Sequence, residues 1–281
     1  MIANLTHQLR VWLYEPIDPR PMRIFRTTIG VLCLVQMVLI WPDLEMWLSN
    51  HGVLPPDVHS TVQPSLRFTL WMFTGYNDIT LSLIKVLGMT GALSLITGFY
   101  ARWGAFLSWL VLSSIAWRNM YILNSGDTLL RLACFFLMFA DTSKPMMNPW
   151  PQRLLQLQLC IVYFVTGIWK SLGPAWRDGS AVGTVLQLSE FQRFYVPDFL
   201  MTPVASKILT FHTLIIELGF PFLVWVPFLK IPMLVAGLAL HAGLEWTLNV
   251  QLFQWIIASF YILFMTAFLP GNTDPSSRPR L

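Results

Sequence analysis

The chain has 281 residues, of which 55% are hydrophobic and only 11% are charged. Water-soluble domains have about 25% charged residues, so this balance excludes an ordinary soluble globular protein and indicates a membrane protein surrounded by lipid. The formal net charge of +4 is modest and gives no reason to expect a nucleic-acid partner, because excess Lys and Arg on a membrane protein usually marks loops that face anionic lipid.

Apolar segments follow one another along almost the whole chain. A helix needs about 20 mostly apolar residues to cross the hydrocarbon core of a bilayer. In chain order, the candidate segments lie near 24–42, 79–99, 103–120, 128–141, 154–172, 206–227, 231–248 and 252–269. The sequence therefore predicts an all-α integral membrane protein, a bundle of about eight transmembrane helices. We expect residues 1–270 to form a single transmembrane domain and residues 271–281 to be a disordered polar tail.

The distribution of charge over the loops predicts the orientation of this bundle. With both termini in the cytoplasm, ten Lys and Arg residues fall on the inner side and five on the outer side, as expected for cytoplasmic loops enriched in positive charge. Two longer loops, about 43–78 and about 173–205, then lie on the outer face. We expect a protein of a bacterial inner (cell) membrane in this orientation.

Ionisable side chains inside apolar segments are costly in lipid, so each is a candidate functional residue. Asp127 and Arg131 are four residues apart, so they share a helix face and can form an ion pair. Asp127 also lies in an Asn-Ser-Gly-Asp sequence that is typical of a helix N-cap. Two readings stay open for these residues: a capped and neutralised helix start, or one polar wall of a substrate pocket.

Lys170 belongs to a polar stripe on an otherwise apolar segment. Gln156, Tyr163 and Lys170 are spaced by seven residues and therefore lie on one helix face, and Gly167 on the same side allows close approach of another helix or a ligand. Lys170 can extend its amine to the membrane surface, which is the structural reading. It can also be a partly desolvated amine that acts as a general base. Trp176 follows on the outer side.

The last two long segments contain two histidines and two glutamates. His212 and Glu217 are five residues apart and share a face poorly, so we expect each to meet other helices. His241 and Glu245 are four apart, which predicts a hydrogen bond between them. A satisfied polar network between helices is the alternative. No recognised metal-ligand spacing is present, and the three cysteines lie singly in apolar runs, so we expect no metal.

Several short motifs, taken in order, resemble those of the HTTM family, the transmembrane domain shared with vitamin K-dependent γ-glutamyl carboxylase. They occupy residues 23–30, 51–55, 126–131, 163–170, Trp176, Gly179, His241 and 252–255, and so span nearly the whole chain. The resemblance implies that Lys170 is the base that deprotonates a reduced quinone cofactor and that His241 assists it. Tyr163, Gly167, Trp176, Asp127, Arg131, His212, Glu217 and Glu245 are then the expected substrate- or cofactor-binding residues.

The sequence also departs from that family pattern. The expected lysine doublet is Trp169-Lys170, and Gly126-Asp127 stands where a histidine would be expected. The chain ends after the membrane domain, so carboxylation of a docked propeptide is not expected unless a separate soluble subunit takes part. Two functions remain open: a quinone-linked oxidoreductase or carboxylase-like enzyme, and a non-catalytic factor for maturation of, or immunity to, a secreted peptide.

Overall fold

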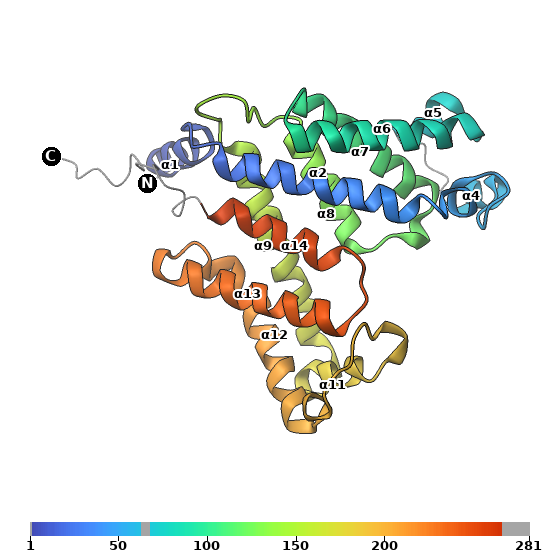
Figure 1. Ribbon diagram of the computed structural model, residues 1–281. Helices are drawn as coiled ribbons and strands as arrows, with labels where there is room; N and C mark the ends of the chain where they lie inside the picture. The colour runs from blue at the N-terminus through green and yellow to red at the C-terminus, as the bar shows by residue number, and fades with distance from the viewer. Residues whose placement is uncertain (1, 63–67, 266–281) are drawn as a thin grey trace. The chain divides into compact units, whose positions relative to one another are not determined.

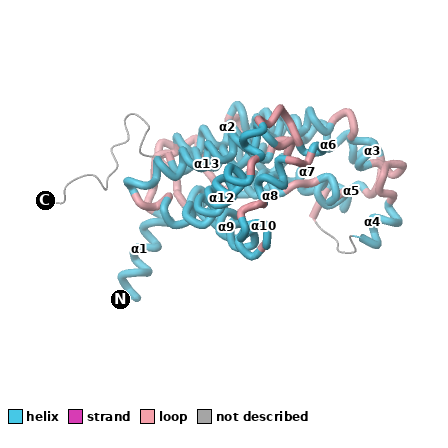
Figure 2. The backbone as a smooth tube through the Cα atoms, turned by 90° about the horizontal axis from the view of Figure 1, so that it is seen from below, coloured by secondary structure: helices cyan, strands magenta, loops and turns pink. Residues whose placement is uncertain are grey.

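The computed structural model describes residues 2–62 and 68–265 of the chain, and within them helices account for the regular structure (Figure 1). The described part contains no β-strand, only the isolated bridges Ile17–Met147 and Gln192–Leu248 (Figure 2). This confirms the expectation of an all-α protein. The predicted polar tail, residues 271–281, lies outside the described residues.

The chain divides into two compact units, and the division falls within helix α9 (Trp150–Leu172). The first unit comprises Met1–Leu155 with Met265–Leu281, and the second comprises Gln156–Phe264. Besides the start of α9, the first unit contains α1 (Ile2–Tyr14), α2 (Arg20–Ile40), α3 (Leu44–Leu48), α4 (Pro56–Val62), α5 (Leu70–Thr74), α6 (Asp78–Thr97), α7 (Ala101–Arg118), η1 (Met120–Ile122) and α8 (Ser125–Leu137).

Close helix packing through small residues organises the first unit. Helices α2 and α6 run side by side, and α6 packs on α7, which in turn packs on α8 (Figure 1). A Cβ atom added to Gly91 of α6 would lie 2.9 Å from the Gly104 carbonyl oxygen of α7, and one added to Gly104 would lie 3.0 Å from the Gly91 carbonyl oxygen. The two backbones therefore approach as closely as glycine permits, as is common where helices associate in lipid.

The second unit combines long apolar helices with short helical turns. It contains the rest of α9, then α10 (Pro174–Asp178), α11 (Ala181–Leu186), η2 (Ser189–Phe191), η3 (Asp198–Met201), α12 (Pro203–Leu223), α13 (Pro227–Thr247), α14 (Phe253–Tyr261) and η4 (Ile262–Phe264). Prolines begin both α12 and α13, where the missing N–H has no partner in any case. Helix α14 runs beside α13, and α11 packs on α12 (Figure 1).

Five of the described helices, α2, α6, α9, α12 and α13, are long and apolar enough to cross a membrane, which supports an α-helical integral membrane protein. The predicted count of eight is not supported. Helices occur at the other three predicted positions, but α7 has an Arg at each end, and α8 and α14 have only 13 and 9 residues. At 1.5 Å per residue, neither α8 nor α14 spans a hydrocarbon core of about 30 Å. The predicted eighth segment, 252–269, also extends past the described residues.

Candidate functional site

The polar stripe predicted on α9 is present, and each of its members contacts a different partner within the second unit. Gln156 Nε2 donates to the Leu263 backbone oxygen at 2.7 Å. Tyr163, about 10 Å further along the helix axis, bonds to side chains of α13 and α14. Lys170, two turns beyond Tyr163, meets α12. The seven-residue spacing thus places three polar groups along one helix face at different depths.

At one end of this face, Lys170 Nζ forms an ion pair with Glu217 Oε1 of α12. The carboxylate side chain is only 8% exposed and the lysine side chain 31%, so the pair is largely shielded from the surroundings. The second carboxylate oxygen, Glu217 Oε2, is buried and accepts no hydrogen bond of normal geometry from the described residues, although the Thr166 hydroxyl lies near the carboxylate. Lys170 Nζ also lies 5.1 Å from the centroid of the Trp176 ring, in cation–π range. We call Lys170 and Glu217 the dyad.

Gly167 makes the dyad possible by letting α9 and α12 approach each other. A Cβ atom at this position would lie 2.8 Å from Leu218 Cδ2 and 3.3 Å from Glu217 Cβ. A larger residue would push the two helices apart and increase the distance between the Lys170 and Glu217 side chains. Of the two neighbours that the sequence allowed for Gly167, a helix or a ligand, the structure shows a helix.

Next to the dyad along α9, four side chains form what we call the histidine chain: Tyr261, Tyr163, His241 and Gln254. Tyr163 Oη lies 2.6 Å from His241 Nε2 and also bonds to Tyr261 Oη. His241 Nδ1 bonds to Gln254 Oε1. Since Gln254 Oε1 only accepts, Nδ1 carries the imidazole proton and Nε2 accepts from the Tyr163 hydroxyl. The hydrogen bonds therefore run in one direction, from Tyr261 through Tyr163 and His241 to Gln254.

The histidine chain is held in a tightly packed aromatic environment. The Phe220 ring lies 4.7 Å from the Tyr163 ring and 5.3 Å from the Tyr261 ring, between centroids. A Cβ atom added to Gly237 of α13 would collide with Tyr261 Oη. The position of the Tyr261 hydroxyl therefore depends on the absence of a side chain at residue 237.

His241 also lines a cavity of about 290 Å³, close to the lower limit of small-molecule sites. Glu245 and Gln254 contribute its polar atoms, and the remaining wall is apolar and aromatic: Phe194, Leu238, Ala242, Trp246, Trp255 and Ala258. The imidazole forms one edge of the cavity while both of its nitrogens are engaged within the protein. His241 is thus placed to position other groups and to hold a proton.

The predicted hydrogen bond between His241 and Glu245 is wrong, although both residues face this cavity. Glu245 Oε1 instead pairs with Arg193 and accepts from Trp255 Nε1 at 3.0 Å. The loop containing Arg193 is fixed beside the end of α13, because the Arg193 backbone N–H donates to Thr247 O at 3.2 Å. A nearby guanidinium is a stronger partner for a carboxylate than a neutral imidazole whose two nitrogens are already bonded.

Three predicted site residues lie apart from these contacts. His212 is exposed on α12, whereas Glu217 is buried, as expected for positions that do not share a face. Asp127 Oδ2 accepts from the Asn124 backbone N–H at 2.7 Å and completes a capping box at the start of α8 in the first unit. Arg131 Nη2 donates to Thr128 Oγ1 at 3.3 Å and lines a separate first-unit cavity of about 460 Å³.

Gln254, Tyr261 and Arg193 belong to the site but were not predicted from the sequence. Gln254 and Tyr261 are seven residues apart, the same spacing that revealed the stripe on α9, so this signal was present in the sequence. Among the described residues, no group of three or more His, Cys, Asp or Glu side chains could hold a metal ion. No protein-family model matches the chain, and no curated protein or solved structure matches it either.

Proposed function

We propose that the chain is a multi-pass membrane enzyme of the HTTM type that removes a proton from a reduced quinone at the Lys170–Glu217 dyad. The proposal is supported by the two ionised side chains facing each other between two apolar helices, α9 and α12, both long enough to cross a membrane. Charged side chains are costly to keep in lipid, so those that occur in membrane-spanning helices usually have a chemical role.

One observation carries the proposal: Glu217 Oε2 is buried and accepts no hydrogen bond of normal geometry within the described chain, because the nearby Thr166 hydroxyl donates to backbone oxygens of its own helix. Buried carboxylate oxygens normally accept hydrogen bonds, because an unsatisfied lone pair loses its hydration without compensation. Lys170 holds the other oxygen and its positive charge offsets that of the carboxylate. Glu217 Oε2 is therefore the atom that would accept a proton from a bound hydroxyl group, with Lys170 fixing the carboxylate. This assigns the base to the dyad as a whole and not to Lys170 alone.

A reduced quinone fits the chemistry of this donor set. It offers an acidic hydroxyl group on an apolar ring, and when bound it would supply reducing electrons after deprotonation. Glu217 would bind the hydroxyl and Lys170 would stabilise the negative charge that remains. The Phe164 and Phe222 rings contact each other on the exposed faces of α9 and α12, more than one helical turn from the dyad, where an isoprenoid tail could approach from lipid.

The histidine chain provides a second proton-handling group on the same face of α9. Its one-directional hydrogen bonds keep His241 neutral, with Nε2 accepting a hydrogen bond from the Tyr163 hydroxyl. The roles are then distinct: the dyad receives the substrate proton, and the histidine chain positions Tyr163 and holds a proton about 10 Å away along α9.

The proposal includes an orientation. Both termini face the cytoplasm of a bacterium, and the dyad lies toward the outer end of α9 in the inner membrane. The shorter helices α7, α8 and α14 complete a bundle of about eight segments without each crossing the full hydrocarbon layer. The excess of Lys and Arg in the loops assigned to the inside supports this arrangement.

One observation favours a different function, the handling of a secreted peptide without catalysis. The segment between α11 and α12 exposes four aromatic side chains: Phe191, Phe194, Tyr195 and Phe199. Exposed aromatic residues on an extracellular loop are typical of a surface that binds another protein or peptide. If the protein has this second function, the dyad has only a structural role and holds α9 against α12.

The test is retention of quinone by the purified protein. Wild type, Glu217→Gln and Lys85→Met are purified in detergent, loaded with reduced short-chain ubiquinone or reduced vitamin K, washed, and analysed by extraction and mass spectrometry. Lys85 is the matched control, a lysine in apolar helix α6 that lies 4.0 Å from the exposed Glu45 carboxylate. We expect Glu217→Gln to bind a quinol about tenfold more weakly, the effect of one charge-assisted hydrogen bond, and Lys85→Met to bind like wild type.

Equal retention by all three proteins, or none by the wild type, would contradict a quinol site at the dyad. In that case, replacing Phe191, Tyr195 and Phe199 together with serine tests the peptide-handling function. Loss of peptide maturation or immunity in that variant, with Glu217→Gln silent, would establish the second function in place of the first.

A further inference from the structure

The turn between α6 and α7 has the features of a membrane–water boundary. Gly98 ends α6 at φ 82°, and Tyr100 begins α7 at φ 49°, so two left-handed residues reverse the chain within a few positions. The rings of Phe99, Tyr100 and Trp103 are 73%, 68% and 68% exposed. Aromatic side chains at the end of a spanning helix concentrate at the level of the lipid headgroups. The turn therefore lies where headgroups are found.

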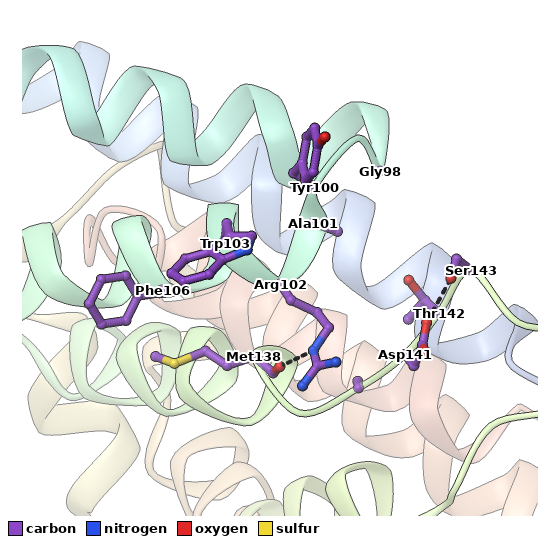
Figure 3. Close-up of a pocket in the computed structure, with 11 residues that line it drawn as sticks. Gly98, Tyr100, Ala101, Arg102, Trp103, Phe106, Met138, Asp141, Thr142 and Ser143 are labelled. Atoms are coloured by element: carbon purple, nitrogen blue, oxygen red, sulfur yellow. Dashed lines mark hydrogen bonds between the residues drawn. The ribbon is translucent and has the colours of Figure 1, made fainter.

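A cavity of about 600 Å³ opens beside this turn, within the first unit (Figure 3). One part of its wall is apolar and follows α7 and α8 through Trp103, Phe106 and Met138. The other part is polar and consists of Arg102 and the segment from Asp141 to Ser143. Figure 3 shows the Arg102 side chain extending from α7 between these two parts. The cavity is thus amphipathic, with its apolar side continuing along a helix.

Positive charge dominates the polar part of this cavity. Arg102 Nε donates to the Met138 backbone oxygen at 2.7 Å, a bond that leaves the two Nη groups of the guanidinium available. Arg26 Nη1 donates to Thr142 Oγ1 at 3.2 Å, and the same guanidinium lies directly behind Gly98. Arg26 Nε is buried and has no partner among the described residues.

Two further cations lie next to the polar part of this wall. Arg23 Nε donates to the Thr142 backbone oxygen at 2.6 Å, and Lys144 Nζ lies 3.1 Å from the Asp141 carboxylate. Four cations (Arg23, Arg26, Arg102 and Lys144) therefore lie in or close to this wall, and Arg102 lines the cavity itself. Two carboxylates are nearby: Asp141, which is paired with Lys144, and Asp18, which is paired with Arg20 and lies near Arg23. The hydrogen bonds with Ser143 and Lys144 hold the pKa of Asp141 below its usual range, so Asp141 keeps its negative charge and positive charge remains in excess.

We propose that this cavity binds an anionic phospholipid, with its phosphate against Arg102 and Thr142 and one acyl chain along Trp103 and Phe106. A guanidinium with free Nη groups matches phosphate oxygens, and the first two N–H groups of α7 precede its first hydrogen bonds, which Trp103 and Gly104 donate to Tyr100 O. Basic cavities between helices at the membrane surface are suited to anionic headgroups. The continuous apolar wall favours a lipid over free phosphate, which would leave that wall uncovered. This site is in the first unit and does not depend on the function proposed for the dyad.

The test compares lipid binding by the full chain and its variants in detergent, measured by native mass spectrometry. The probes are dioleoyl phosphatidylglycerol, dioleoyl phosphatidylcholine, dihexanoyl phosphatidylglycerol and inorganic phosphate. The variants are Arg102→Gln and a matched control, Arg177→Gln, since Arg177 Nε likewise donates to a backbone oxygen, that of Ser171, at 3.0 Å. We expect about tenfold weaker binding of dioleoyl phosphatidylglycerol by Arg102→Gln and wild-type binding by Arg177→Gln. Phosphatidylcholine should bind more weakly than phosphatidylglycerol.

A second variant keeps the test decisive if Arg102→Gln folds poorly. Trp103→Ala removes an exposed ring and should weaken binding of the dioleoyl lipid while leaving that of the dihexanoyl lipid unchanged. Equal affinity of wild type, Arg102→Gln and Trp103→Ala for dioleoyl phosphatidylglycerol would overturn the proposal. Displacement of the lipid by millimolar inorganic phosphate would also overturn it, because the ligand would then be a soluble anion.

Discussion

The two units of this protein treat their buried polar side chains differently. In the first unit, most of these side chains donate to backbone carbonyl groups of loops and helix ends. The bonds run from Trp71 to Ser114 O (3.0 Å), from Arg118 to Ser49 O (2.8 Å), from His59 to Trp117 O (2.9 Å) and from Asn119 to Trp47 O (3.2 Å). A backbone carbonyl accepts a hydrogen bond but does not take up a proton. These four contacts hold segments in place and cannot relay protons, although His59 also bonds through Nδ1 to Tyr76 Oη at 2.8 Å.

In the second unit, several buried hydroxyl and amide groups likewise donate to backbone oxygens, but the members of one set of buried side chains bond to one another. The dyad joins two ionisable side chains, and the histidine chain joins two phenols, an imidazole and an amide. Every link except the amide can gain or lose a proton. The difference indicates that polar burial mainly fixes the architecture of the first unit, whereas in the second unit it also creates a connected set of groups that can carry out acid–base chemistry. The two units are distinguished by the hydrogen-bond partners of their buried polar side chains, and not by how many such side chains they have or how deeply these are buried.

The largest effect on stability is expected from removing one of the two charged side chains of the dyad. Lys170→Met leaves the Glu217 carboxylate buried without its partner, which for a fully buried pair costs about 3–5 kcal/mol. Because the Lys170 side chain is 31% exposed, we discount this to about 2 kcal/mol. Glu217→Gln should cost less, about 1 kcal/mol, since the lysine can extend toward the membrane surface. Thermal unfolding in detergent measures both.

The double variant Lys170→Met/Glu217→Leu is the control for this asymmetry. Replacing both charges with apolar groups removes the unpaired charge, so its stability should return to within about 1 kcal/mol of wild type. If the double variant is as unstable as the sum of the two single variants, the charges do not act as a pair and the distinction between the two units is lost.

An effect of similar size is expected from displacing one hydroxyl group of the histidine chain. Gly237→Ala places a methyl group against Tyr261 Oη and should destabilise the protein by about 1–3 kcal/mol through overpacking. Gly243→Ala, two turns away on the same helix, is the matched control, because a Cβ atom there meets nothing within 4 Å. That variant should be more stable by about 0.5–1 kcal/mol, the ordinary gain from replacing a helical glycine. Equal changes in the two variants would show that Tyr261 is not held as described.

The sequence allowed prediction of the helices and of the residues that make up much of the site, but not of their pairing. Each of the eight segments predicted from hydropathy contains a helix, five of them long and apolar enough to cross a membrane, and the cost of charge in lipid identified Lys170, Glu217 and His241. Partner choice depends on which helices adjoin, so Lys170 could not be matched with Glu217, 47 residues away. The expected bond between His241 and Glu245 relied on local spacing alone, and a loop arginine proved to be the stronger partner. Gln254 was missed because it carries no charge, although it lies seven residues before Tyr261.

In the first unit, the acid sensitivity of stability should depend on His59. Burial lowers its pKa below the usual 6.5, and the nearby Arg118 charge lowers it further, while the bond to Trp117 O opposes them. Below about pH 6.5 the unfolded chain therefore binds a proton at His59 that the folded chain does not, and the free energy of unfolding decreases as pH falls toward the folded-state pKa. We expect the loss between pH 7 and 5.5 to be no more than about 1 kcal/mol, the limit for a group whose unfolded-state pKa is 6.5. Denaturant unfolding across this range should show a shallower decrease for His59→Gln, and an unchanged slope would contradict the assignment.

The smallest effect, and the one that decides the role of Asp127, concerns the capping box of α8. Asn124 Oδ1 accepts from the Gly126 and Asp127 backbone N–H groups at 2.7 and 3.3 Å, and Asp127 Oδ2 accepts from the Asn124 N–H in return. Asn124→Ala should cost about 1 kcal/mol of stability, as should Asp127→Ala, and neither should change quinol retention. If Asp127→Ala abolishes quinol retention while Asn124→Ala does not, Asp127 contributes to a ligand site. The buried polar residues of the first unit would then have a functional role as well as a structural one. Equal, small losses of stability in the two variants would instead show that Asp127 acts only as a helix cap, as its hydrogen bonds indicate.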